Sequence, residues 1–257
     1  MFRKLLLKAS RHVWLRRKLP SDLGGIVLHL SPKAGGLKYW KPNLEAADPE
    51  LLSLVREYVK PGMCVWDVGA NVGLFAFSAA GRAGANGKVL ALEPDVDCLQ
   101  GLLRTQQALA LADVAEMTIL GVAASRGVHR IARFLIAADA RASNSLDGFG
   151  NTVMGGVAEV RTVVTLSLDE LLDATFRPQV IKIDVEGAEM DVLAGANRVL
   201  QEVRPTILLE VSQSQQRAVA ELFSRYKYDV LDGSKRPADR VPLQEAAWTT
   251  VAVPRAQ

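Results

Sequence analysis

The sequence predicts an α/β domain with additional segments on its N-terminal side. Two stretches indicate this fold class, because each runs from an apolar strand through acidic and glycine residues into a helix; they cover residues 64–80 and 180–200. A chain of 257 residues, 49% hydrophobic and 23% charged, is typical of a globular protein with an ample core. The predicted organisation is a basic extension (1–20), an accessory hairpin and helix (21–58) and the α/β domain (59–257).

The positive charge of the chain is concentrated at its N-terminus. Residues 1–20 carry seven basic side chains and no acidic one, whereas the rest has 24 basic and 28 acidic residues, a net charge of −4. This distribution argues against a nucleic-acid partner. Residues 1–13 can form a helix with one apolar and one basic face. Such a helix predicts contact with an anionic membrane, a solvated extension, or packing on the body or on a second subunit.

The compartment is predicted from the cysteines and from the lengths of the apolar runs. Cys64 and Cys98 are expected as buried thiols in a reducing compartment. No apolar run approaches the roughly 18 residues of a membrane span, and the N-terminal run is too short for a signal peptide. The prediction is therefore a cytoplasmic protein, with peripheral contact of residues 1–20 with the inner membrane face as an open alternative.

The accessory segment is predicted to contain a hairpin and a helix. Residues 26–30 and 37–40 alternate as short strands around a turn that contains proline and glycine. Residues 48–58 follow as a helix, because Asp48 is a good N-cap and Pro49 suits the first helical position.

The α/β domain is organised around residues 64–73, Cys-Val-Trp-Asp-Val-Gly-Ala-Asn-Val-Gly. The loop lies at the carboxyl end of a strand, where open α/β sheets bind ligands. Gly69 and Gly73 allow close approach of the backbone, and the helix that follows directs N–H groups at a ligand. Asn71 stands where a dinucleotide fingerprint needs glycine, and the Gly-Lys-Ser/Thr of a P-loop is missing. The preceding acid, Asp67, suits a cationic ligand group.

Two further strands extend the predicted ligand site and favour a nucleoside. Residues 88–92 form a buried strand that ends at Glu93, where a carboxylate can accept hydrogen bonds from a ribose diol. Glu93 could also cap the helix predicted over residues 96–107. Residues 117–120 form the next strand, and Ala123 follows it among small residues that can lie against a flat adenine.

A second informative stretch is residues 180–189, Val-Ile-Lys-Ile-Asp-Val-Glu-Gly-Ala-Glu. A buried strand ends at Asp184, and Glu186 and Glu189 follow before a helix predicted over residues 190–200. Three carboxylates around one strand tip are more than helix capping requires.

The remaining elements are predicted from their apolar patterns. They are a strand or hairpin arm (128–135), a strand (160–168), a strand with Glu210 at its tip (206–209), a helix (214–225) and two final edge strands (228–231 and 248–253). Residues 141–156, which include Asn144, are rich in Ser, Asn and Gly. Because a loop of this length is often a lid or a binding loop, it is assigned to substrate access.

In their order along the chain, these motifs resemble the FkbM-type family of S-adenosylmethionine-dependent methyltransferases. The resemblance covers about residues 59–211. It is carried by Lys60-Pro61-Gly62, by the segment Asp67 to Gly73, by Leu92-Glu93-Pro94, by the segment Thr165 to Asp169, and most distinctively by the segment Lys182 to Glu189. The resemblance implies the Rossmann-like class I fold, a doubly wound, mostly parallel seven-stranded sheet. It also implies S-adenosylmethionine as cofactor and O-methyl transfer to a hydroxyl of a sugar, a lipid-linked glycan or a natural product.

Residue roles follow from the resemblance position by position. The residues that would line the methionine side of the cofactor are Asp67, Gly69, Asn71 and Gly73. Glu93 would hold the ribose, and Ala123 would lie near the adenine. Asp184 and Glu186 would face the transferable methyl group and the acceptor, and they are the predicted catalytic residues. The family often has a histidine within two residues of Glu210, whereas this chain has Val-Ser there, so no histidine is available for acid–base catalysis.

The predicted mechanism rests mainly on alignment of the acceptor. The cofactor is already activated, so an oxygen has to be held in line with its methyl carbon. Asp184 or Glu186 would orient the acceptor hydroxyl and could deprotonate it. No metal is predicted, although the same acids could bind Mg²⁺ together with a diol. A non-catalytic binding protein on a degenerate methyltransferase fold stays open, whereas a nicotinamide-dependent dehydrogenase is disfavoured by Asn71.

Overall fold

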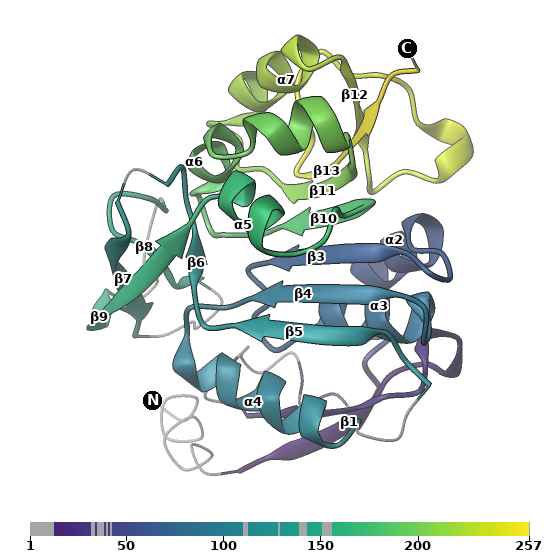
Figure 1. Ribbon diagram of the computed structural model, residues 1–257, viewed down its shortest axis with the longest axis vertical. Helices are drawn as coiled ribbons and strands as arrows, with labels where there is room; N and C mark the ends of the chain where they lie inside the picture. Colours follow the sequence, from purple (N-terminus) through teal and green to yellow (C-terminus); the bar gives the residue numbers. More distant parts are fainter. Residues whose placement is uncertain are drawn as a thin grey trace.

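A mixed seven-stranded sheet forms the centre of the molecule (Figure 1). The computed structural model describes residues 13–31, 34, 39, 41, 43–109, 113–127, 129–138, 143–150 and 156–256. The strand order in the sheet is β12 (Tyr228–Asp232), β13 (Thr249–Pro254), β11 (Thr206–Glu210), β10 (Val180–Ile183), β3 (Cys64–Val68), β4 (Lys88–Leu92) and β5 (Glu116–Leu120). The last five strands in this order run parallel, so their carboxyl ends meet at one edge of the sheet.

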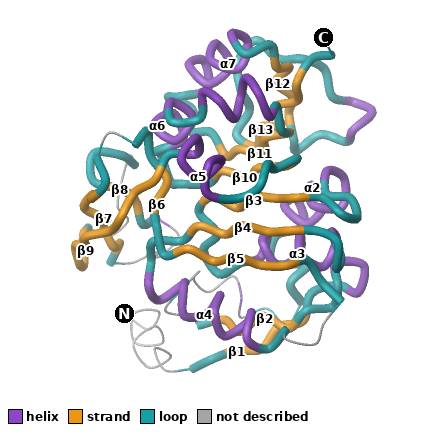
Figure 2. The backbone as a smooth tube through the Cα atoms, in the orientation of Figure 1, coloured by secondary structure: helices purple, strands orange, loops and turns teal. Residues whose placement is uncertain are grey.

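Helices cover both faces of this sheet (Figure 2). One apolar cluster packs α2 (Pro49–Tyr58), α3 (Leu74–Ala83) and α4 (Val96–Gln107) against the strands. The other cluster packs α5 (Leu168–Ala174), α6 (Glu189–Ala194) and α7 (Gln216–Arg225) against the opposite face. The central strands are therefore buried on both sides, which explains why their sequences are almost continuously apolar.

The sheet is mixed, whereas the sequence predicted a mostly parallel one. Strand β13 pairs antiparallel with β11 on one side and with β12 on the other. The prediction that both final strands lie at the edge was therefore correct for β12 and wrong for β13. Strand order cannot be seen in an apolar pattern, because the edge strand and its inner neighbour are both short alternating runs.

The N-terminal part forms a separate two-stranded ribbon. Strand β1 (Leu15–Lys18) pairs antiparallel with β2 (Val27–Leu30) around the 3-10 turn η2 (Ser21–Leu23). The strand predicted at residues 26–30 is thus confirmed with β1 as its partner, and most of the expected partner at 37–40 lies outside the described residues. The helix predicted over residues 1–13 also lies outside them, apart from its last residue. Of the helices that are described, none is long and apolar enough to cross a membrane.

Helix α2 begins as predicted. The Asp48 carboxylate accepts a hydrogen bond of 3.2 Å from the Leu51 backbone N–H, and Pro49 occupies the first turn.

The helix predicted over residues 190–200 is divided in two. Helix α6 ends at Ala194, and a π-helical turn, η5 (Val199–Val203), follows. Gly195 lies between them against the chain after β6, where a Cβ atom would lie 2.5 Å from the Ser125 carbonyl oxygen. The Asp169 carboxylate accepts hydrogen bonds from the backbone N–H groups of Arg198 and Val199, which fixes the start of the second piece.

A small second sheet projects beyond the carboxyl ends of the main strands (Figure 1). Its order is β6 (Ala123–Ala124), β9 (Val157–Leu166), β7 (Ile131–Ala137) and β8 (Ser145–Leu146). Strands β7 and β9 form a long antiparallel hairpin, which confirms the predicted hairpin arm. This hairpin places side chains beside the strand ends where the predicted site lies.

Candidate active site

The parallel strands bring the predicted residues of three motifs to one cavity. Val68 is in register with Leu92 on one side and with Ile183 on the other. The next residues along these strands, Gly69, Glu93 and Asp184, therefore emerge side by side and line the cavity. Of the other predicted residues, Asn71, Ala123 and Glu186 also line it. Asp67 and Gly73 do not.

Close backbone approach explains the glycine at position 69. Its φ of +80° lies in the left-handed region, and a Cβ atom there would lie 1.9 Å from the Asp184 carbonyl oxygen. Gly73 has a different structural role. It is the N-cap of α3 at φ +85°, and a Cβ atom would lie 2.5 Å from the Leu102 side chain. Gly69 thus shapes the cavity, whereas Gly73 permits the packing of α3 against α4.

Glu93 is held in place by backbone donors. Its Oε2 accepts a hydrogen bond of 2.6 Å from the Asn71 N–H, and its Oε1 accepts one of 2.7 Å from the Asp95 N–H. Burial raises the pKa of Glu93 to about 8, and these two hydrogen bonds oppose the rise. The carboxyl group is fixed at the cavity wall, with lone pairs left to accept hydrogen bonds from a ligand.

A buried lysine contacts two residues of the cavity lining, Gly69 and Asp184. The Lys182 Nζ donates a hydrogen bond of 2.9 Å to the Gly69 carbonyl oxygen and lies 3.4 Å from Asp67 Oδ1 and 3.3 Å from Asp184 Oδ2. Burial raises the pKa of Asp67, which is 0% exposed, and the Lys182 charge partly offsets this. For Lys182, burial disfavours the charge, but the carboxylates around it raise its pKa above the ordinary value. Asp67 therefore positions the loop and Asp184 through Lys182.

A second cavity adjoins the first, because Asp184 and Glu186 line both of them. Glu186 has a φ of +52°, and Gly187 follows at +100°, so the backbone turns sharply there. Loss of solvation beside the protein and the charges of Asp184, Glu210 and Glu189 raise the pKa of Glu186 to about 8, although its side chain is exposed. Asp184 and Glu186 thus form the wall between two adjoining cavities.

The small sheet supplies an apolar wall to the first cavity. Ala123, Phe134 and Leu146 belong to one buried cluster and all line the cavity. Phe134 and Leu146 are paired across β7 and β8, so the two side chains lie next to each other. Such a wall suits a flat apolar ligand group.

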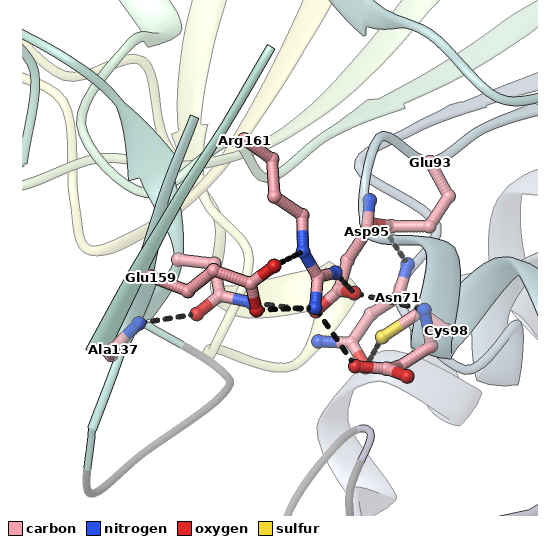
Figure 3. A network of polar contacts seen from close by, with 9 residues as sticks. Asn71, Glu93, Asp95, Cys98, Ala137, Glu159 and Arg161 are labelled. Atoms are coloured by element: carbon pink, nitrogen blue, oxygen red, sulfur yellow. Dashed lines mark hydrogen bonds and ion pairs between the residues drawn. The ribbon is translucent and has the colours of Figure 1, made fainter. Parts of the chain in front are cut away.

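An arginine ties the hairpin to the main domain at the rim of this cavity (Figure 3). Arg161 of β9 donates to Asp95 at 2.7 Å and to Asp97 at 3.2 Å, both at the start of α4, and also to Glu159 at 2.8 Å. Asp95 in addition accepts a hydrogen bond of 2.8 Å from the Asn144 side chain. Asp95 therefore links both the hairpin and the residue before β8 to the start of α4.

Replacing Arg161 with Ala is expected to lower the free energy of unfolding by about 2 kcal/mol and to increase hydrogen exchange in β7 and β9, because two largely buried carboxylates lose the ion pair with Arg161. Denaturation in urea and exchange measured by mass spectrometry test this. The matched control is Arg133→Ala in the same hairpin. Arg133 pairs with Asp147 at the surface, with side chains 65% and 42% exposed, so less than about 1 kcal/mol is expected. Equal losses of stability in the two variants would contradict a stabilising role of the buried Arg161 ion pairs.

Sequence reasoning missed Arg161, Phe134 and Lys182 as parts of this site. Arg161 and Phe134 lie in alternating strands and carried no local signal. Lys182 was visible as a charge inside an apolar strand, and a buried charge requires a partner. Within the described residues, no group of three or more His, Cys, Asp or Glu side chains is arranged to hold a metal ion.

A family model described as the methyltransferase FkbM domain matches residues 67–230. The chain belongs to the FkbM methyltransferase family. This confirms the resemblance drawn from the motifs. Among curated proteins, the hexuronic acid methyltransferase AglP of Haloferax volcanii is 27% identical to this FkbM protein over 194 residues, 73% of this chain and 72% of that one.

Solved methyltransferase structures are also similar to this FkbM protein. Methyltransferase FkbM from Methylobacillus flagellatus has a TM-score of 0.46 and 17% identity; the match covers 81% of this chain and 52% of that chain, so this protein spans about half its length. Precorrin-6y C5,15-methyltransferase from Geobacter metallireducens has a TM-score of 0.45 and 14% identity, over 86% of this chain and 92% of that one.

Proposed function

We propose that this protein is an S-adenosylmethionine-dependent O-methyltransferase whose acceptor is a hydroxyl of a sugar, a glycan, a lipid-linked glycan or a natural product. The observation that carries the proposal is the pair of adjoining cavities with Asp184 and Glu186 in their common wall. A transferase needs one site for the donor and one for the acceptor, with reactive groups at their junction. The similarity to a hexuronic acid methyltransferase supports a sugar acceptor.

The kinds of residue that line the first cavity suit the chemical groups of S-adenosylmethionine. The missing Cβ of Gly69 leaves room at the strand tip, and Asp184 offers a carboxylate for a cationic group. Glu93 would hold the ribose hydroxyls, and Ala123 with Phe134 would lie against the adenine. Asn71, whose N–H donates to Glu93, keeps that carboxylate in place. When bound, this cofactor supplies a methyl group activated by a positively charged sulfur.

The chain's own contribution to the chemistry is to hold the acceptor and to receive its proton. Asp184 is fixed by Lys182 at 3.3 Å, so it is suited to orient the acceptor hydroxyl. Glu186, with its pKa raised to about 8, is a stronger base than an ordinary carboxylate and is suited to accept the hydroxyl proton. We therefore assign positioning to Asp184 and proton transfer to Glu186.

The rival proposal is a non-catalytic binding protein on the same fold. Titration calorimetry with S-adenosylmethionine and a transfer assay with radiolabelled cofactor against glycan, lipid and small-molecule extracts separate the two. We expect micromolar binding and a labelled product. Binding without any labelled product would favour the binding protein, and absence of binding would overturn both the cofactor site and the enzyme.

Glu93→Gln is expected to weaken cofactor binding about tenfold at pH 8, because an ionised carboxylate is the better acceptor for a diol. With the Glu93 pKa at about 8, more of the carboxyl becomes ionised between pH 6 and 8. The ratio of wild-type to variant affinity should therefore rise from pH 6 through pH 8 and level off only above about pH 9, where nearly all of the carboxyl is ionised. Calorimetry at several pH values tests this. The control is Glu116→Gln, because Glu116 begins β5 at the edge of the sheet away from the cavity. A ratio independent of pH would contradict the role of Glu93.

A further inference from the structure

The second cavity, which shares Asp184 and Glu186 with the first, is otherwise lined by different residues. Its volume is about 320 Å³, at the lower end of the range of ligand pockets. It is formed where the loop around β8, the start of α6, the end of β11 and the chain before β13 and α7 meet. The lining residues that matter below are Asp184, Glu186, Glu189, Glu210, Gln215 and Trp248.

The charges in this lining are all of one sign. Four acidic side chains line the cavity, those of Asp184, Glu186, Glu189 and Glu210, and the described part of the lining contains no Lys, Arg or His. Asp184 is paired with Lys182, and the pKa values of Glu186 and Glu189 are raised by loss of solvation, so the negative charge is smaller than four but is not reversed. Their mutual repulsion contributes to the raised pKa of Glu186. An anionic ligand would add a further negative charge, whereas a neutral or cationic ligand would relieve the repulsion.

Two buried oxygen atoms of the lining lack hydrogen-bond donors. Glu189 is 2% exposed; its Oε1 accepts from the Val185 and Gly187 N–H groups at 3.3 and 2.9 Å, but its Oε2 has no partner in the described part of the chain. Gln215 donates through Nε2 to the Gly187 carbonyl at 2.8 Å, and its Oε1 is likewise buried without a described partner. A hydroxyl or ammonium group of a ligand can supply the hydrogen bonds that these two oxygen atoms lack.

An exposed aromatic side chain forms part of the same lining. Trp248 is 61% exposed, although it is the largest side chain there. Its carbonyl oxygen accepts a hydrogen bond of 2.8 Å from the Val211 N–H, which fixes the backbone beside Glu210. An indole ring in this position offers a flat apolar surface beside a set of acceptors.

We propose that this cavity binds the methyl acceptor as a neutral or amine-bearing sugar ring, whose donors pair with Glu189 and Gln215 and whose C–H face stacks on Trp248, and that it rejects sugars carrying a carboxylate. This inference rests on the proposed function and narrows its substrate class. It separates this chain from the relative named for hexuronic acid, because a uronate would have to enter a cavity lined by four acidic side chains.

Three methyl glycosides that differ mainly in charge test the proposal: methyl glucoside, methyl glucosaminide and methyl glucuronide. Their binding to the full chain with S-adenosylhomocysteine is measured by saturation-transfer NMR titration. We expect the glucuronide to bind roughly tenfold more weakly than the other two. Glu210→Gln should narrow this difference to about threefold, because one like charge is removed. Trp248→Ala should weaken all three by roughly tenfold, and Trp248→Phe should restore most of the loss.

Two surface variants serve as controls, Glu221→Gln on α7 and Val241→Ala, neither of which lines the cavity. The inference is overturned if the glucuronide binds as well as the neutral sugar, if Trp248→Ala has no effect, or if no glycoside binds. If the wild-type chain still binds S-adenosylmethionine in these cases, only the proposed acceptor class is wrong. Loss of cofactor binding by the wild-type chain would instead overturn the proposed function.

Discussion

Lys182→Met is expected to lower the free energy of unfolding by about 3 to 5 kcal/mol at pH 7. Methionine fills a similar space, but it leaves the fully buried Asp67 without its cation and removes the hydrogen bond to the Gly69 carbonyl. The loss should shrink as the pH falls, because a protonated Asp67 no longer needs a countercharge. Urea denaturation followed by circular dichroism measures it.

Lys88→Met is the matched control, since Lys88 also lies in a strand of the main sheet. Its ion pair with Glu116 is at the surface, with side chains 50% and 71% exposed, so a change within about 1 kcal/mol is expected. If the two variants lose the same stability, Lys182 is not the buried centre of the site.

Gly69→Ala is expected to cost about 2 to 4 kcal/mol of stability and to abolish detectable cofactor binding. The added Cβ would lie 1.9 Å from the Asp184 carbonyl oxygen, so one of the two strand ends has to shift. Either shift moves Asp184 relative to Glu93 and changes the shape of the cavity. Thermal unfolding and titration calorimetry give the two readouts.

Gly62→Ala separates this clash from backbone strain. Gly62 has nearly the same φ, +81°, but a Cβ atom there would have no atom within 4 Å. We expect a loss of about 1 kcal/mol and unchanged cofactor binding. Similar losses at positions 62 and 69 would mean that the left-handed backbone, and not the strand contact, accounts for the effect.

The parts of the site that could be predicted from the sequence are those carried by strand tips. Parallel neighbours end at one edge of a sheet, so an acid directly after each strand is brought to the same place whatever the loops do. This reasoning placed Glu93 and Asp184 correctly at one cavity. Asp67 does not line this cavity, because it lies within β3, two residues before Gly69, and its side chain is buried beside Lys182.

The remainder could not be predicted because it depends on contacts between distant segments. Arg161 meets Asp95 across 66 positions of the chain, and nothing in the local pattern of β9 distinguishes it from a solvated arginine. Trp248 was assigned to an edge strand and instead lines a cavity with Glu210. The break after α6 depends on the approach of Gly195 to the chain after β6, which a helical pattern does not contain.

The inner position of β13 has a consequence for synthesis of the protein. Until residue 254 has emerged from the ribosome, β11 has no neighbour on one side, and the backbone of residues 207–210 is open to pairing with other chains. A chain that stops at Asp232 should therefore sediment as aggregate, whereas the full chain should not. Because β13 lies between β11 and β12, both of these strands stay without a neighbour on that side until β13 has been made.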